Sequence, residues 1–228
     1  MVSATSDAFV IAMRGAWTQK IFGALPRPLG PGFVDEVARC YPFNPSLIQL
    51  AEQEWAPVAG FQKVRSTILI FAAAAYVQAQ RGKAGEWVPA LIGPGDLPLS
   101  ASQVREAIIG SGLIADERTA VNYRQLAATD IVSDDGQRGS ARTLDLQRRS
   151  APFSGANPRA AERAATALFL YSIVGARSQG RQGATEAELK AATFAPNAAY
   201  APVDAETVLA EPSCPVPLQR ISAQGDIP

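Results

Sequence analysis

Apolar residues recur at helical spacing along most of this 228-residue chain. The first such stripe consists of Phe9, Val10, Met13, Trp17 and Ile21. It predicts an amphipathic helix over residues 1–25, and an exposed stripe there would need a partner surface. Proline and glycine then dominate residues 26–32, which predicts a linker without regular structure. A short helix is expected over residues 33–40.

A pair of helices is predicted next, with a corner between them. Asn44 is suited to cap the first helix and Pro45 to begin it, because one side chain accepts an unpaired amide and the other residue has no amide to satisfy. The apolar positions of the first helix are Leu47, Ile48, Ala51 and Trp55. Pro57 and Gly60 interrupt the chain. A second helix is expected from near Phe61, and its apolar positions are Phe61, Val64, Ile68, Phe71 and Ala75.

Two cations stand where the second helix begins. Lys63 and Arg65 fall in the first turn, where the helix dipole and the free amides favour anions. Cations beside free amides form a small anion-attracting spot of the kind that a phosphate uses. The alternative is an ordinary ion pair with Glu52 or Glu54 of the preceding helix, and such surface pairs contribute little stability. The residues alone leave both interpretations open.

Further helices are expected down the chain. A capping box at 100–103 predicts a helix that carries Val104, Ile108 and Ile109 and is closed by Gly110, and a short helix is expected over residues 122–128. Asn157 and Pro158 are expected to start a strong helix with Ala161, Ala164, Leu168 and Tyr171 on one face, ended by Gly175. Thr185 and Glu188 form another capping box, and a last helix is expected over residues 203–209. The predicted fold class is therefore mainly α.

Residues 130–150 are the part that periodicity describes least well. Asp134, Asp135 and Gly136 predict a turn, and the arginines that follow are Arg138, Arg142, Arg148 and Arg149. These arginines allow a basic, substrate-facing loop. Scattered arginines among acids more often belong to a solvated loop, which is the expectation here.

Composition excludes several classes of chemistry. The chain contains no histidine, which excludes Ser-His triads, histidine acid–base catalysis and most zinc sites. Its two cysteines are too few for a disulfide framework or a metal cluster, so no metal site is predicted. The formal net charge of zero gives no global attraction to nucleic acid or to anionic membranes. No secretory signal is visible, and the longest apolar run, 68–77, is about half of a membrane span. A cytoplasmic protein is expected.

Two motifs carry a family resemblance. The first is Tyr41-Pro42-Phe43-Asn44-Pro45, and the second is Phe61-Gln62-Lys63-Val64-Arg65 at the head of an apolar helix. In this order and spacing they resemble a family of large prokaryotic AAA+-type ATPases, catalogued as domain of unknown function family 499 and often encoded beside phage-defence genes. That family usually has His where this chain has Asn44, and Thr-Arg-Gly where it has Val64-Arg65-Ser66. The resemblance extends from about Arg39 to Leu209.

The residue patterns, together with the resemblance, predict a division of the chain into four parts. Residues 1–25 would be the amphipathic helix, residues 33–150 a helical lid-like region, residues 151–210 a helical and winged-helix-like module, and residues 211–228 a disordered, proline-rich tail. The implied site residues are Arg65 and Lys63, which would sense nucleotide from a lid. The motif residues Tyr41, Pro42, Phe43, Pro45, Phe61 and Gln62 complete the implied site.

The sequence lacks the parts of an ATPase that bind nucleotide. Residues 175–182 have the two glycines of a P-loop but neither its Lys nor its Ser/Thr, and they follow a predicted helix, where a P-loop follows a strand. No apolar strand ends in the acid of a Walker B motif. The resemblance therefore implies the portion that follows the ATPase core, which is not catalytically competent alone. ATP and magnesium are implied only for a full-length protein.

Two other functional classes remain open. The chain could be a helical adaptor that binds another protein through the stripe of residues 9–21. It could also be a DNA-binding module that uses its last helices, although Lys190 is the single basic residue of residues 185–192. The expected partners are a missing ATPase core or other protein subunits, with nucleic acid only in a full assembly and no membrane.

Overall fold

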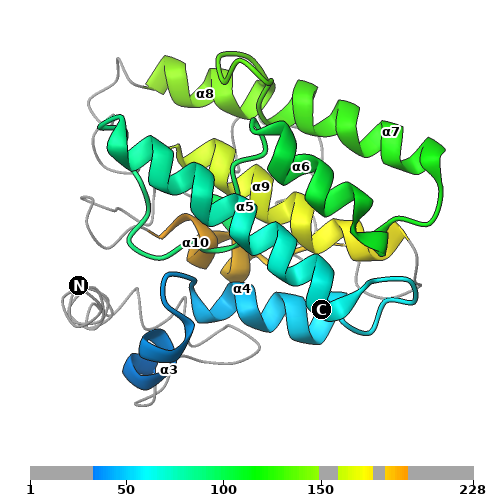
Figure 1. Ribbon diagram of the computed structural model, residues 1–228. Helices are drawn as coiled ribbons and strands as arrows, with labels where there is room; N and C mark the ends of the chain where they lie inside the picture. Colours follow the sequence, from blue (N-terminus) through cyan, green and yellow to red (C-terminus); the bar gives the residue numbers. More distant parts are fainter. Residues whose placement is uncertain (1–32, 149–158, 177–182, 195–228) are drawn as a thin grey trace, which may run out of the picture.

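The computed structural model describes residues 33–148, 159–176 and 183–194, which form a bundle of helices (Figure 1). This confirms the mainly α fold class. Within the described residues there is no β-strand, and Phe43 and Ile92 form one isolated parallel bridge. The helices predicted for residues 1–25 and 203–209, the tail from 211 and the cap at Asn157 and Pro158 lie outside the described residues. The winged-helix detail stays a prediction.

The described α-helices follow in chain order. They are α3 (Phe33–Cys40), α4 (Pro45–Gln49), α5 (Lys63–Lys83), α6 (Ser102–Ile108), α7 (Glu117–Leu126), α8 (Ser140–Arg148), α9 (Ala160–Ser172) and α10 (Glu186–Thr193). Three of them continue into a wider π-helical turn: α4 into η1 (Leu50–Trp55), α6 into η3 (Ile109–Leu113) and α7 into η4 (Ala127–Ile131). Two short 3₁₀ turns are η2 (Pro94–Asp96) and η5 (Ile173–Ala176).

Helix α9 lies at the centre of the bundle. Every residue from Ala160 to Tyr171 is buried, and α9 packs against α8, α10, η2 and η4. Its small alanines let these neighbours approach on all sides. One hydrophobic cluster runs from Leu47 to Ala192, so the core includes residues from both sides of the predicted boundary at residue 150.

The predicted start of α4 is confirmed. The Asn44 side chain accepts a hydrogen bond from the Ser46 amide at 3.0 Å, and Pro45 is the first helical residue. Leu47 and Trp55 are fully buried, as their spacing predicts. The Trp55 indole N–H donates to the carbonyl of Leu170, which joins this segment to α9.

The predicted buried face of α5 is partly wrong. Phe71 is buried, but Val64 and Ile68 are exposed, and the helix buries Ile70 and Ala74 in their place. The orientation is fixed by two polar contacts on the buried side: Ser66 donates to the Ser111 carbonyl at 3.1 Å, and Gln78 donates to the Asp96 carbonyl at 2.6 Å. Apolar residues lie all around this helix, so periodicity did not single out one face.

The boundaries of α6 and α7 also differ from the prediction. Ala101 occupies the N-cap position of α6 without a side-chain hydrogen bond, and the hydroxyl of Ser100 accepts a hydrogen bond from Arg81. The chain continues past Gly110 to Gly112, whose φ of 91° ends the segment. Helix α7 begins at Glu117, before the predicted residue 122, because the Asp116 carboxylate accepts the amide of Thr119.

The expectation of a solvated loop over residues 130–150 is wrong for its second half. The turn at 134–136 and the exposed Arg138 fit the expectation, but residues 140–148 form α8. Arg142 and Asp145 are buried beside α9. Their burial depends on contacts with residues far along the chain, which local composition did not reveal.

The last two described helices agree better with the sequence. Helix α9 begins at Ala160, after Arg159 in a left-handed conformation, and continues through Ile173 into η5. The predicted capping box of α10 is confirmed: Thr185 accepts from the Glu188 amide, and Glu188 accepts from the Thr185 amide. Among the residues described, no helix is both long and apolar enough to cross a membrane.

Candidate functional site

The two predicted nucleotide-sensing residues lie at the exposed start of α5. Lys63 and Arg65 are both in its first turn, and the Gln62 side chain makes no capping hydrogen bond there. Within the described part of the chain, neither cation forms the ion pair with Glu52 or Glu54 that was the alternative interpretation. Two unpaired cations next to free amides are an unfavourable arrangement for an isolated helix. They are therefore available to an anionic group from outside.

An apolar stripe continues from these cations along α5. We define the α5 face as Val64, Arg65, Ile68, Leu69, Ala72, Tyr76 and Lys83, which share one side of the helix. The exposed fractions of Val64, Ile68, Leu69 and Tyr76 are 74%, 62%, 56% and 59%. Single exposed apolar residues are normal, whereas several in one stripe are typical of an interaction site. Helix α5 runs across the front of the bundle beside α6 (Figure 1).

Helix α5 carries only positive charge. Its charged residues are Lys63, Arg65, Arg81 and Lys83, and its sequence contains no Asp or Glu. Arg81 is half-buried and donates to Ser100; burial and then the nearby Arg159 lower its pKa. The other three cations are exposed. The α5 face is thus an apolar stripe with unpaired cations near both ends.

The predicted motif residues support α5 from beneath. The Phe43 ring lies 4.6 Å from the Phe71 ring of α5, measured between centroids. The backbone of the same motif is tied to the 90–96 segment, because Asn44 donates to the Ile92 carbonyl and Ile92 donates to the Pro42 carbonyl. Pro45 is buried and Tyr41 is half-buried, so the first motif serves packing.

The second motif contributes both to packing in the core and to the exposed charge at the start of α5. The buried Phe61 ring meets Trp55 edge-on at 6.2 Å. Gln62 and Lys63, which follow it, are exposed. The anchored aromatic residue therefore fixes where α5 begins, and the next turn presents Lys63 and Arg65 to solvent.

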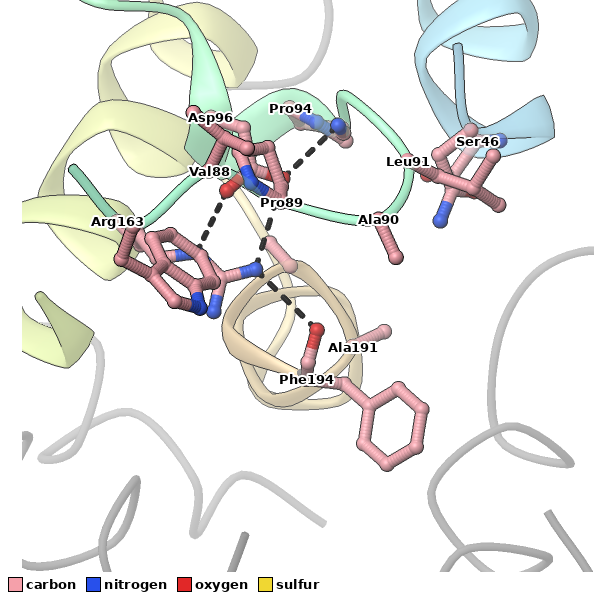
Figure 2. A pocket seen from close by; sticks show the side chains of 14 residues that line it. Ser46, Val88, Pro89, Ala90, Leu91, Pro94, Asp96, Arg163, Ala191 and Phe194 are labelled. Atoms are coloured by element: carbon pink, nitrogen blue, oxygen red, sulfur yellow. Dashed lines mark hydrogen bonds and ion pairs between the residues drawn. The ribbon is translucent and has the colours of Figure 1, made fainter. Parts of the chain in front are cut away.

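A second cluster of charges is buried in the bundle around Arg163. Figure 2 shows this side chain reaching from α9 between Asp96 and the backbone of Phe194. Its Nε donates to Asp96 at 2.7 Å, and its terminal nitrogens donate to the carbonyls of Thr193 at 2.7 Å and Phe194 at 3.2 Å. The guanidinium also lies 5.3 Å from the centroid of the Trp87 ring, within cation–π range. One side chain thus joins α9, η2 and the end of α10.

The cavities next to this cluster are too small for a ligand. The pocket of Figure 2, lined by Asn44, Trp87, Asp96 and Arg163 among others, has a volume of about 20 Å³. A neighbouring cavity beside Arg81 and Arg159 has about 10 Å³. Such volumes hold about one water molecule each. The Arg163 cluster is therefore structural, and burial raises the pKa of Asp96 against the opposing effect of Arg163.

A third buried group lies where α8 meets α9. The Asp145 carboxylate accepts the amides of Ala161 and Glu162, both at 2.9 Å, and so caps the start of α9 from a neighbouring helix. Arg142 lies 3.7 Å from Glu162 in the same buried region and donates to the Gly136 carbonyl at 2.8 Å. Sequence reasoning missed Asp145 and Arg163 as well as Asp96. The available indication was a charge among apolar residues, alanines around Arg163 and leucines around Asp145, but the partner was not identifiable.

We expect Asp145 to give the chain a specific pH dependence. Burial raises its pKa from 3.8 to about 6, despite the two amides. The folded chain then binds the proton more tightly than the unfolded chain, so the free energy of unfolding falls as pH rises from about 4 to about 6, by about 3 kcal/mol in total. Urea unfolding at several pH values, for the wild-type chain and for Asp145→Asn, measures this contribution as the difference between the two curves. Parallel curves would show that Asp145 does not titrate in this range.

No protein-family model, no curated protein and no solved structure matches this chain. The resemblance to AAA+-type ATPases therefore depends on the two motifs alone. In the part of the chain that the structure describes, no three His, Cys, Asp or Glu side chains are grouped to hold a metal ion. Among the described residues, the α5 face is the feature that we develop as a candidate site.

Proposed function

We propose that this chain is the post-core portion of an AAA+-type ATPase linked to phage defence, and that it docks on the nucleotide-binding core through the α5 face. The observation that carries the proposal is the exposure of four large apolar side chains in one stripe of α5. Packing such a stripe against another protein releases water from apolar surface. The family resemblance supplies the kind of partner.

Arg65 has a defined role in this proposal. It lies at the N-terminal end of the apolar stripe, so its stem can rest on Leu69 and Ala72 while its head extends toward the partner. A cation placed at an interface with a nucleotide-binding core can stabilise the charge that develops on the γ-phosphate. Lys63 lies two residues earlier in the same first turn, on the other side of the helix, and would add to the positive potential at this end.

A second candidate is a helical adaptor for another class of protein. The exposed α5 face supports this candidate as well, because an exposed apolar stripe is typical of interaction sites for many kinds of partner. Residues 9–21, which the sequence suggested for that role, lie outside the described residues. A DNA-binding role gains nothing from α10, where Lys190 forms an ion pair with Glu186.

The test requires a neighbouring reading frame that encodes a P-loop polypeptide, as the proposal predicts, and combines that polypeptide with this chain. We expect the two to co-elute in size-exclusion chromatography, with magnesium-dependent ATP turnover only in the complex. Leu69→Glu should abolish co-elution, because it buries a charge in an apolar interface. Arg65→Ala should leave the complex intact and lower turnover by about a hundredfold.

Val121→Glu provides the matched control, because Val121 is an exposed apolar residue on α7, outside the α5 face. It should change neither co-elution nor turnover, and circular dichroism should show all variants folded. ATP hydrolysis by this chain alone, abolished by a point mutation within it, would contradict the proposal. So would a neighbouring P-loop polypeptide that does not bind it.

A further inference from the structure

We propose that the partner element received by the α5 face is an amphipathic helix with acidic residues near both ends. This inference rests on the proposed docking function and adds the chemistry of the partner. It follows from the spacing of the apolar stripe, from the sign of the charges on α5 and from the exclusion of two other occupants.

The dimensions of the face suit one helix. From Val64 to Tyr76 the apolar stripe covers about 18 Å, at a rise of about 1.5 Å per residue. From Arg65 to Lys83 the same helix covers about 27 Å. A partner helix of about 18 residues therefore spans the whole face, with apolar residues at helical spacing along its middle. Its terminal turns come to lie opposite the cations of α5.

The charges select an acidic partner. Arg65 stands at one end of the stripe and Lys83 at the other, Lys63 adds a third exposed cation in the first turn on the other side of the helix, and α5 contributes no carboxylate of its own. Complementary charges on a partner raise the association rate and suppress wrong partners. Because both ends of α5 are positive, acidic residues are needed at both ends of the partner helix, whichever direction it runs.

The same charges argue against a second copy of this chain. If two α5 faces met in antiparallel fashion, Lys63 and Arg65 of one copy would lie opposite Lys83 of the other. In a parallel arrangement each cation would meet its own equivalent. Like charges directly opposed are unfavourable, so the face is suited to a different chain.

The N-terminal residues of this chain do not complement the face either. The charged side chains of residues 1–25 are Asp7, Arg14 and Lys20, one acid against two bases. Their apolar stripe could match the middle of α5 but not its ends. A separate acidic partner fits better.

The test uses three synthetic amphipathic peptides of about 20 residues, which share one leucine stripe and differ only in their terminal turns. These turns carry glutamate, glutamine or lysine. In calorimetric titrations of the full chain at low salt, we expect the glutamate peptide to bind at least about tenfold more tightly than the lysine peptide. Raising the salt from about 0.05 M to about 0.5 M should remove most of that difference, because exposed charges are then screened.

Charge reversal provides a specific check. The triple variant Lys63→Glu, Arg65→Glu and Lys83→Glu should reverse the preference and favour the lysine peptide. Leu69→Ser combined with Tyr76→Ser should weaken every peptide by at least about tenfold, whereas Val121→Ser on α7 should weaken none. In the triple variant, glutamates replace Lys63 and Arg65 in the first turn of α5. Acidic residues are favourable there because of the helix dipole, so the variant should fold.

Equal binding of all three peptides, or no binding, would overturn the proposal. Binding to phosphatidylglycerol vesicles without binding to the glutamate peptide would also overturn it. So would a peptide of residues 1–25 that binds more tightly than the glutamate peptide. Dimerisation of the chain that depends on concentration and is lost in Leu69→Ser would have the same consequence. The proposed function has a separate test. If Leu69→Glu abolishes co-elution with the P-loop polypeptide while no acidic peptide binds, docking through α5 stands and only the acidic helix is excluded.

Discussion

Replacing Arg163 with methionine should lower the free energy of unfolding by about 3–5 kcal/mol, because it leaves the buried Asp96 without its cation. The variant also removes the donors to the carbonyls of Thr193 and Phe194 at the end of α10. For a chain of this length, the midpoint of thermal unfolding should fall by roughly 10 °C. Calorimetry and urea unfolding measure the two quantities.

Two comparisons identify the cause of that loss. Arg138→Met removes an exposed arginine that pairs with Asp135, and it should leave the unfolding midpoint almost unchanged. The double variant Arg163→Met with Asp96→Asn should lose less stability than the sum of the two single variants, because no unpaired carboxylate remains. Additive losses would show that the two side chains act independently, which would contradict the coupled role assigned to them here.

Gly112→Ala should cost at least about 3 kcal/mol, because the substituted residue is both strained and obstructed. Gly112 has a φ of 91°, which side chains with a Cβ rarely adopt. A Cβ at this position would lie 2.1 Å from the carbonyl oxygen of Gly60, a backbone atom that cannot rotate away. The clash displaces the corner before α5, so binding through the α5 face should weaken as well.

Gly110→Ala is the matched control, two residues away in the same turn. A Cβ on Gly110 would meet nothing within 4 Å. This substitution should stabilise the chain by up to about 1 kcal/mol, since alanine loses less backbone entropy than glycine in a helix. Equal effects of the two substitutions in urea unfolding would show that neither the conformation nor the contact of Gly112 matters.

Under the proposed function, the α5 face would let a chain without net charge select a partner. The formal net charge is zero, yet three exposed cations are concentrated on one helix. Acidic residues are placed elsewhere, for example Glu106 and Glu117, which pair with Arg124 on the α6–α7 side. Local distribution of charge, more than its total, decides recognition.

Much of the helical framework was determined by local sequence. Asn44 with Pro45, and Thr185 with Glu188, mark two helix starts that the structure confirms, because a cap is formed by residues within one turn of each other. The place of Lys63 and Arg65 in the first turn of α5 was also predictable, since it requires only the start of the helix. Short-range rules suffice where the interacting groups are neighbours in sequence.

The tertiary structure decided which face of α5 is buried. Val64 and Ile68 are as apolar as Ile70 and Ala74, so spacing alone did not distinguish them. The choice was made by Ser66 and Gln78, whose partners Ser111 and Asp96 lie in other elements. For the same reason, neither the pairing of Arg163 with Asp96, 67 residues away, nor the capping of α9 by Asp145 was predictable from local sequence. Burying a charge is favourable only when a partner is in place, and partners this distant are brought together only when the chain folds.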